Sequence, residues 1–462
     1  MKRVYIDVSD FLVWRGHFTG IQRVLYNVIK EVSGQDNVEL IVFSQGEYQV
    51  VEQSIDDIVL RGIVSTEEET ELATEQRTTR TLAKYIYQRL PTPVQATERA
   101  ARSRIRDGLS RSTPLARNVL HHWRELRGTN EEYAALHLAR QSDPMEIAAS
   151  TGSQRYGTEV NFAKGDSLLV LGCLWDSVAH LHVATRRATE MGAKLHCLIY
   201  DLVPVYAPQV FGVGLLPMYT RYLFEVLGVA SSVVTISRST KKDVERFMKE
   251  TAISDPPEVT VLRLGDEVIE KIDPRVQKEM IQKHSSPFAI CVGTIEARKN
   301  HIQLYTALKL AIQEGCIDVL PKIYLIGRQG WLTADLIHLI TYDPELNNRV
   351  KFMDNVSDQE LAWLYQNAEL TVYTSQYEGW GLPVAESLAY GTPVITSNVS
   401  SMSEIAPDLT INISPFDSRA LLDALLFLSN KKSNDALRAK IKKVYRPARW
   451  SETVRSLRRA IR

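Results

Sequence analysis

The sequence predicts an α/β protein with two doubly wound parallel sheets that face each other across a cleft. The chain has 462 residues, too many for one ordinary domain. Runs of strand character alternate with runs of helical spacing, as in βαβ units. The alternation divides at residues 266–287, which are charged and contain two prolines. We therefore predict a first domain over residues 1–265, a linker over 266–287 and a second domain over 288–449.

The composition argues against several classes of protein. Apolar residues make up 44% of the chain and charged residues 24%, as in soluble globular proteins. Lysine plus arginine equals aspartate plus glutamate at 55 each, so no overall field attracts nucleic acid. The four cysteines are widely spaced and show no metal-binding pattern. The chain opens directly on a strand and contains no apolar run of membrane-spanning length, so we expect a cytoplasmic protein, at most peripheral on the inner membrane face.

The first domain begins with a strand, a glycine loop and a helix. Apolar residues recur at helical spacing from Ile21 to Ile29, directly after Gly16 and Gly20. Asp201 follows a later strand and therefore stands at a carboxyl edge, the side on which open sheets bind ligands. We predict strands over residues 3–7, 38–43, 167–171, 194–200, 232–237 and 259–264.

The alternation of strands and helices is lost over about residues 50–160. This segment is longer than any ordinary loop. Residues 99–127 hold eight arginines against two acids, Asp107 and Glu125. We interpret the segment as a helical or partly disordered insertion. One interpretation is that it docks on an anionic membrane that holds a lipid-linked acceptor. The other is that it forms a solvated helical excursion or an oligomer contact.

The second domain opens with a similar arrangement. A strand over residues 288–292 ends in Gly293, and Arg298 and Lys299 follow just before a helix. Two adjacent cations beside a helix start favour an anion site. Further strands are predicted over residues 322–326, 350–353, 370–373 and 393–396, and a last amphipathic helix over 450–462.

Residues 375–396 read SQYEGWGLPVAESLAYGTPVIT and lie between two strands. Gly379 and Gly381 allow a ligand to approach the backbone. Pro383 suits the first turn of a helix, whose amino terminus attracts an anion. Glu378 and Glu386 lie eight positions apart, so both carboxylates can face one ligand that carries several hydroxyls. A nucleotide diphosphate sugar fits this description.

This stretch resembles the E-x7-E signature of retaining glycosyltransferases of family four, which have the two-domain GT-B fold. The resemblance implies that Lys299 and Arg298 hold the donor diphosphate, that Glu378 holds hydroxyls of the donor sugar, and that the C-terminal helix returns to the first domain. The positions that match the signature are Glu378, Gly379, Gly381, Leu382, Pro383, Glu386, Gly391, Pro393 and Val394.

The resemblance extends to other loops. Residues 19–23 (TGIQR) correspond to a loop beside the donor phosphates, and Asp201 matches an aspartate of the cleft. Two positions depart from the family: Tyr200 stands where a histidine is common, and Thr294 where an arginine is common. The implied catalytic residues are Glu378, Lys299, Arg298 and Asp201, and the implied donor-binding residues are Gly20, Gly293, Thr294, Arg328, Met353, Gly379, Trp380, Gly381, Leu382 and Glu386.

The expected function is transfer of a hexose from a nucleotide diphosphate sugar to a growing surface polysaccharide or a lipid-linked glycan, with retention. The TGIQR and YDLVP segments resemble mannosyl and rhamnosyl enzymes, which favours GDP-mannose over dTDP-rhamnose or a UDP-sugar. No D-x-D motif is evident, so we expect no metal and no cofactor.

Three other functions are compatible with a two-domain fold of this kind. The first is a nucleotide-sugar-binding module that has lost turnover, with Tyr200 and Thr294 as the substitutions that inactivate it. An epimerase of the same architecture would need no acceptor. A hydrolase is disfavoured, because a carboxylate flanked by phosphate-binding cations stays ionised and is a poor acid.

Overall fold

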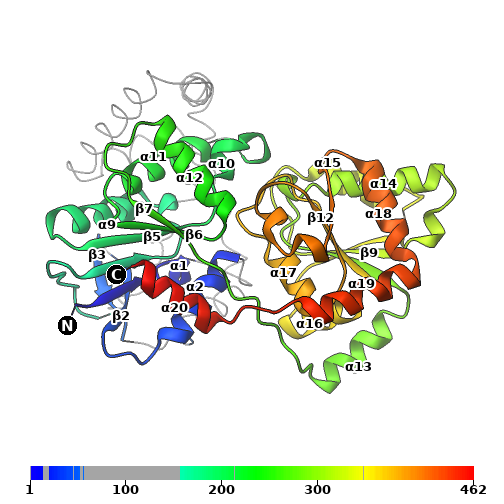
Figure 1. Ribbon diagram of the computed structural model, residues 1–462, viewed down its shortest axis with the longest axis horizontal. Helices are drawn as coiled ribbons and strands as arrows, with labels where there is room; N and C mark the ends of the chain where they lie inside the picture. Colours follow the sequence, from blue (N-terminus) through cyan, green and yellow to red (C-terminus); the bar gives the residue numbers. More distant parts are fainter. Residues whose placement is uncertain are drawn as a thin grey trace, which may run out of the picture.

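The computed structural model describes residues 2–13, 20–44, 46–52, 56, 157–212, 214–346 and 348–461. Two α/β units lie side by side, each built on a mainly parallel sheet (Figure 1). The basic part of the predicted insertion lies outside the described residues, and so does the membrane contact proposed for it. Within the described residues, no helix is both long and apolar enough to cross a bilayer.

The first sheet has the strand order β3-β2-β1-β4-β5-β6-β7 within the described residues. Its neighbours pair in parallel except for β2 and β3, which form an antiparallel hairpin. Tyr5 and Ile6 are consecutive residues of β1, yet they belong to separate apolar clusters on the two faces. Burial on both faces explains the continuous apolar runs. The strands are β1 (Val4–Asp7), β2 (Val38–Ser44), β3 (Glu47–Val50), β4 (Ser167–Val170), β5 (Lys194–Ile199), β6 (Ser232–Thr235) and β7 (Glu258–Val261).

Serine side chains cap the start of two helices of this domain, α9 and α12. The Ser177 hydroxyl accepts a hydrogen bond from His180 N at 3.2 Å, and the Ser237 hydroxyl accepts one from Thr240 N at 2.9 Å. Both serines therefore cap the amides that a helix leaves unpaired at its start. The helices are α1 (Asp10–Val13), α2 (Gly20–Val32), α9 (Val178–Glu190), α10 (Val203–Tyr206), α11 (Leu215–Leu227) and α12 (Arg238–Glu250).

The second sheet has the order β10-β9-β8-β11-β12-β13 within the described residues, all in parallel. Its strands are β8 (Phe288–Val292), β9 (Lys322–Ile326), β10 (Val350–Met353), β11 (Leu370–Tyr373), β12 (Val394–Ser397) and β13 (Ile411–Ile413). Its helices are α13 (Pro274–Lys283), α14 (His301–Gln313), α15 (Ala334–Tyr342), α16 (Asp358–Asn367), α17 (Leu382–Ala389), α18 (Ser418–Ser429) and α19 (Lys431–Val444).

The segment predicted as a linker contains a helix. The Asp273 carboxylate accepts a hydrogen bond from Arg275 N at 2.7 Å, and Pro274 occupies the first turn of α13. Met280 of this helix packs with Phe288 and Trp363 of the second domain. Within this segment, the proline and the charged residues mark a helix start and a solvated helix face.

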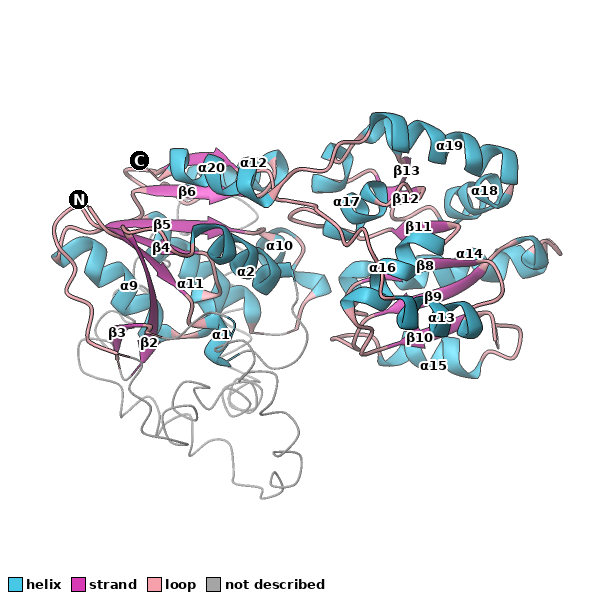
Figure 2. Ribbon diagram, turned by 90° about the horizontal axis from the view of Figure 1, so that it is seen from below, coloured by secondary structure: helices cyan, strands magenta, loops and turns pink. Residues whose placement is uncertain are grey.

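In the described part of the chain, two segments cross between the domains. Helix α20 (Trp450–Ala460) returns to the first domain, where it packs on α2 (Figure 1). The buried Asp266 accepts a hydrogen bond from Ala448 N and one from the Tyr445 hydroxyl, so it joins the outgoing and returning segments. The carboxyl ends of β5 and β6 face the second domain (Figure 2). Loops after these strands therefore meet loops of the other sheet.

Candidate active site

The loop after β8 presents two cations at the edge of the second sheet. A short 3-10 turn over Ala297–Lys299 is followed by Asn300, whose backbone is left-handed with φ 61°. The buried Asn300 amide donates hydrogen bonds to Thr374 O at 3.1 Å and Pro415 O at 2.7 Å. The loop is thereby attached to the ends of β11 and β13. Arg298 and Lys299 consequently have a fixed place, as a preorganised site requires.

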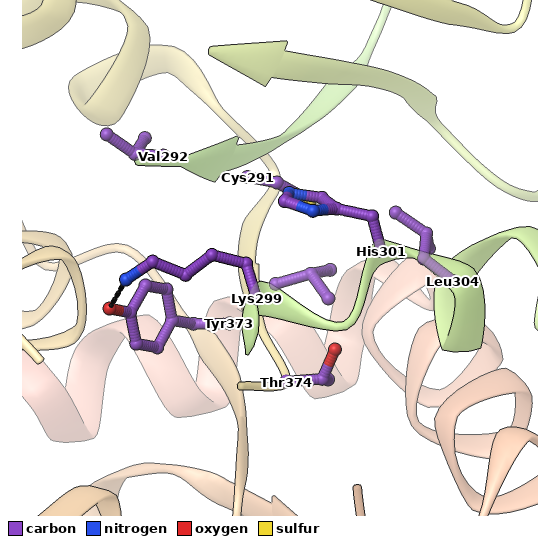
Figure 3. Close-up of a pocket in the computed structure, with 8 residues that line it drawn as sticks. Cys291, Val292, Lys299, His301, Leu304, Tyr373 and Thr374 are labelled. Carbon is purple, nitrogen blue, oxygen red and sulfur yellow. Dashed lines mark hydrogen bonds between the residues drawn. The ribbon is translucent and has the colours of Figure 1, made fainter. Parts of the chain in front are cut away.

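Lys299 lies between a phenol and a carboxylate. Its Nζ atom is 2.6 Å from the Tyr373 hydroxyl and 2.6 Å from Glu378 Oε1. Lys299 and Tyr373 both line a small pocket between β8, α14 and β11 (Figure 3). Burial lowers the pKa of Lys299, although the charge of Glu378 opposes this effect. The ammonium is thus tied to the first glutamate of the signature.

Arg298 lies between two acids. Its Nη2 is 2.6 Å from Glu296 Oε1, and its Nη1 contacts Glu378 Oε2. Burial lowers the pKa of Arg298, but the Glu378 and Glu296 charges outweigh it and leave the pKa raised. Both carboxylates are buried. Arg298 therefore joins two carboxylates of the site through ion pairs. One of these carboxylates, that of Glu296, is not among the predicted site residues.

Glu378 is held ionised. Burial raises the pKa of its carboxyl, but the charges of Arg298 and Lys299 outweigh burial and lower the pKa to about 2. Its backbone N–H donates to the Ser400 hydroxyl at 3.0 Å. At neutral pH this carboxylate can accept hydrogen bonds and cannot donate a proton.

The signature glycines allow close packing between the domains. A Cβ added at Gly379 would lie 2.0 Å from the Tyr200 carbonyl oxygen and 3.0 Å from Asp201 Cβ. Gly381 has φ +130°, a conformation that favours glycine. Leu382 and Pro383 follow as the first residues of α17. The glycine loop therefore touches the end of β5 in the first domain.

Trp380 is buried where the two domains meet. Its side chain is 8% exposed and packs with Tyr373 and Val384 in an apolar cluster that extends into the first domain. The Arg263 guanidinium carbon lies 5.7 Å from the ring centroid, within range of a cation–π contact. The indole thus contributes to packing between the domains.

Asp201 faces this loop from the first domain. Its Oδ1 accepts a hydrogen bond from Val203 N at 3.0 Å, the ordinary role of an aspartate after a strand. Burial raises the pKa of Asp201, although the charge of Arg298 lowers it. Both domains therefore supply carboxylates to the same charged cluster.

Glu386, the second signature glutamate, is contacted from both domains. The buried Tyr365 hydroxyl donates to its Oε2 at 2.9 Å. Arg23 Nη1, from the first turn of α2, lies 2.7 Å from its Oε1. Gly20 begins the same helix, so the first turn of α2 lies against the signature helix α17.

The loop after β9 comes close to the loop after β8. A Cβ at Gly327 would lie 2.2 Å from Gly293 O, and Gly327 N donates to Met353 O at 2.8 Å. Ile295 N donates to Arg328 O at 2.9 Å. Gly293, Thr294, Arg328 and Met353 are thereby gathered at one edge of the sheet.

Two further contacts join the domains. Trp331 Nε1 donates to Val210 O at 2.9 Å, and its ring stacks on Phe211 at 5.4 Å between centroids. Glu404 accepts hydrogen bonds from Ser239 N at 2.6 Å and Arg238 N at 3.0 Å, at the amino terminus of α12. A carboxylate is favourable there because of the helix dipole.

Residues 274–444 match the family described as Glycosyl transferases group 1. The second domain is a glycosyltransferase group 1 domain. The match includes Arg298, Lys299, Glu378 and Glu386.

Several curated relatives of the chain are mannosyltransferases. The Escherichia coli serotype-specific mannosyltransferase WbdA is 28% identical over 54% of this chain and 31% of that protein. The chain therefore spans about a third of the length of this relative. The O-antigen chain mannosyltransferase B of E. coli is 29% identical over 44% of this chain and 52% of its own length. RfbU of Salmonella typhimurium, an O-antigen chain mannosyltransferase, is 26% identical over 49% of this chain and 58% of its own length.

Solved structures confirm the predicted GT-B fold. Sucrose-phosphate synthase from Thermosynechococcus elongatus superposes with a TM-score of 0.59 at 15% identity, over 99% of this chain and 98% of that one. Anabaena HepE in complex with UDP and glucose superposes with a TM-score of 0.56 at 13% identity, over 99% of both chains. The group 1 domain is thus one half of a two-domain glycosyltransferase fold.

Proposed function

We propose that the chain is a retaining glycosyltransferase that moves mannose from GDP-mannose to a growing surface polysaccharide or a lipid-linked glycan. The group 1 domain and the similarity to O-antigen mannosyltransferases support this proposal. dTDP-rhamnose and UDP-sugars are the alternative donors. The enzyme acts in the cytoplasm, or peripherally on the inner membrane face.

The observation that carries the proposal is the position of Lys299. Its ammonium lies 2.6 Å from Glu378 Oε1 at the carboxyl edge of the second sheet, opposite the glycine loop of the signature. Breaking the bond between sugar and diphosphate leaves negative charge on the departing phosphate. A fixed cation stabilises that charge without reorganising water during the reaction. Lys299 is the group that supplies this stabilisation in the proposed reaction.

The two signature glutamates have positioning roles. Glu378 stays ionised and accepts hydrogen bonds from hydroxyls of the donor sugar, while Glu386 accepts them from the ribose. Neither carboxylate attacks the anomeric carbon. The acceptor hydroxyl attacks from the face that the diphosphate leaves, and a phosphate oxygen takes its proton, which gives retention. No metal takes part in this scheme.

The test is a donor and acceptor screen by mass spectrometry. GDP-mannose, dTDP-rhamnose and UDP-glucose are each incubated with a set of oligosaccharides and lipid-linked glycans, in the presence and absence of EDTA. We expect acceptor-dependent release of GDP that EDTA does not reduce, and a new linkage of the same anomeric configuration as the donor. Binding of a donor without release would indicate the impaired binding module. Interconversion of sugar nucleotides without an acceptor would indicate an epimerase.

A further inference from the structure

An apolar cavity of about 220 Å³ lies in the first domain, away from the charged cluster around Glu378. Helices α2 and α20 cover it on one side, and strands β1, β2 and β4 line the other. Val4 and Val38, the first residues of β1 and β2, place it toward the amino ends of the strands. The signature loop meets the carboxyl end of β5, so the cavity lies toward the opposite edge of this parallel sheet. Its buried lining residues are Ile6, Val28, Val32, Leu169, Val454 and Leu457.

The lining favours an aliphatic ligand. Apart from Asn37 and Arg458, every residue that lines the cavity is valine, isoleucine or leucine. Cavities with such walls stay free of water, and one of about 150 Å³ binds benzene. By proportion, a cavity of about 220 Å³ accommodates a chain of roughly eight carbon atoms. Each methylene that moves from water into this cavity gains hydrophobic free energy.

The two polar lining residues mark the side on which the cavity meets solvent. Arg458 of α20 is exposed, and Asn37, just before β2, is half-buried. The guanidinium is always charged, and within the described part of the chain no carboxylate pairs with it. Helix α20 also carries the exposed Arg455 and Arg459. Its one acid, Glu452, lies in its first turn. An anionic group is therefore favoured at this mouth.

We propose that this cavity binds a single aliphatic chain with an anionic head group, and that Arg458 pairs with the head. Fatty acids and anionic lipids share this chemistry. A bound chain fills the cavity and so stabilises the packing of α20 on α2. The inference goes beyond the proposed glycosyl transfer and does not depend on it, because no residue of the charged cluster lines the cavity.

Calorimetry and thermal unfolding of the full chain test the site. Sodium octanoate, sodium butyrate and 1-octanol are each titrated into the wild type. We expect octanoate to bind at least tenfold more tightly than butyrate, because four more methylenes are buried. It should also bind more tightly than 1-octanol, which has no charge for Arg458, and it should raise the midpoint of thermal unfolding.

Three variants locate the ligand. Val454→Phe fills the cavity, so it should lose octanoate binding while its thermal midpoint stays at or above that of the wild type. Arg458→Gln should bind octanoate at least fivefold more weakly, yet bind 1-octanol as the wild type does. Arg459→Gln is the matched control, because Arg459 is exposed on the same helix but does not line the cavity. It should bind both compounds as the wild type does.

Vesicles distinguish the two sources of the chain. Flotation with phosphatidylglycerol vesicles that is lost in Val454→Phe would identify an anionic lipid, whereas octanoate binding without flotation would identify a free carboxylate. A wild type that binds no octanoate would overturn the inference, and so would wild-type octanoate affinity in Val454→Phe or in Arg458→Gln. If Val454→Phe does not fold, the comparison of Arg458→Gln with Arg459→Gln still decides. None of these outcomes bears on the proposed transfer reaction.

Discussion

Lys299 Nζ lies 2.6 Å from Glu378 Oε1, so the cation proposed for the donor diphosphate and the carboxylate proposed for the donor sugar hold each other in the empty site. Both side chains are largely buried, at 11% and 7% exposure. An arriving phosphate must share Lys299 with Glu378, and both groups are already oriented when it arrives. The cost of ordering two side chains is therefore met during folding, before a donor binds.

Glu386→Ala should weaken nucleoside diphosphate binding about tenfold, because the ribose loses its hydrogen-bond acceptor and Tyr365 loses its partner. Calorimetry with GDP measures the effect. Glu279→Ala is the control, since Glu279 lies on the solvated face of α13, where it pairs with Lys283. Unchanged affinity in Glu386→Ala would contradict the ribose role.

Gly379→Ala should destabilise the contact between the domains, since its Cβ would lie 2.0 Å from the Tyr200 carbonyl oxygen. We expect a fall of several degrees in the midpoint of thermal unfolding, as roughly 2 kcal/mol of overpacking would give. Gly212→Ala is the matched control, because a Cβ there meets no atom within 4 Å. Equal midpoints for the two variants would show that the close approach at Gly379 is not needed.

Stability should depend on pH through Glu378. The charges of Arg298 and Lys299 lower its pKa in the folded protein to about 2, from 4.5. A carboxyl with a lowered pKa stabilises the fold above its unfolded value, and this contribution is lost as pH falls from about 4.5 toward 2. Thermal midpoints of the wild type and Glu378→Gln should therefore differ most near neutral pH and converge in acid. A difference that stays constant with pH would contradict the ionised state.

Glu296→Gln should lower turnover about tenfold or more, because Arg298 loses one of its two charged partners and its hold on Glu378 loosens. Initial rates of nucleotide release, with the affinity for the nucleoside measured alongside, test this. Glu296→Asp keeps the charge and should recover part of the rate, and nucleoside affinity should stay unchanged in both variants. A positioning role would be refuted by wild-type turnover in Glu296→Gln.

Much of the fold could be predicted because burial on both sheet faces leaves apolar runs in the sequence. Ser167–Val170 and Phe288–Val292 are strands of this kind, and the two-domain prediction follows from their alternation with helices. Short edge strands lack this signal: Glu47–Val50 and Ile411–Ile413 were not predicted. Helix α13 was also missed, since one buried residue, Met280, is too little for a recognisable apolar stripe.

The candidate site could be predicted where chemistry is tied to sequence spacing. Glu378, Gly379 and Glu386 lie in one stretch, and Arg298 and Lys299 are adjacent. Contacts between distant segments left no such trace. Arg23 and Glu386 are 363 positions apart in the sequence (386 − 23). Their ion pair depends on how the two domains pack against each other. Glu296 stands in a predicted loop, but nothing in the sequence marks it as the partner of Arg298.

In the proposed reaction, Lys299 stabilises the departing diphosphate. The most direct measurement is the rate of GDP release from GDP-mannose, with an accepted glycan, for the wild type and Lys299→Ala. We predict a loss of about two orders of magnitude or more, the size expected when a preorganised charge is removed from a transition state. Lys440→Ala, a substitution of an exposed lysine that bonds the Asp408 carbonyl, serves as the control and should keep the wild-type rate. Full activity in Lys299→Ala would contradict the account.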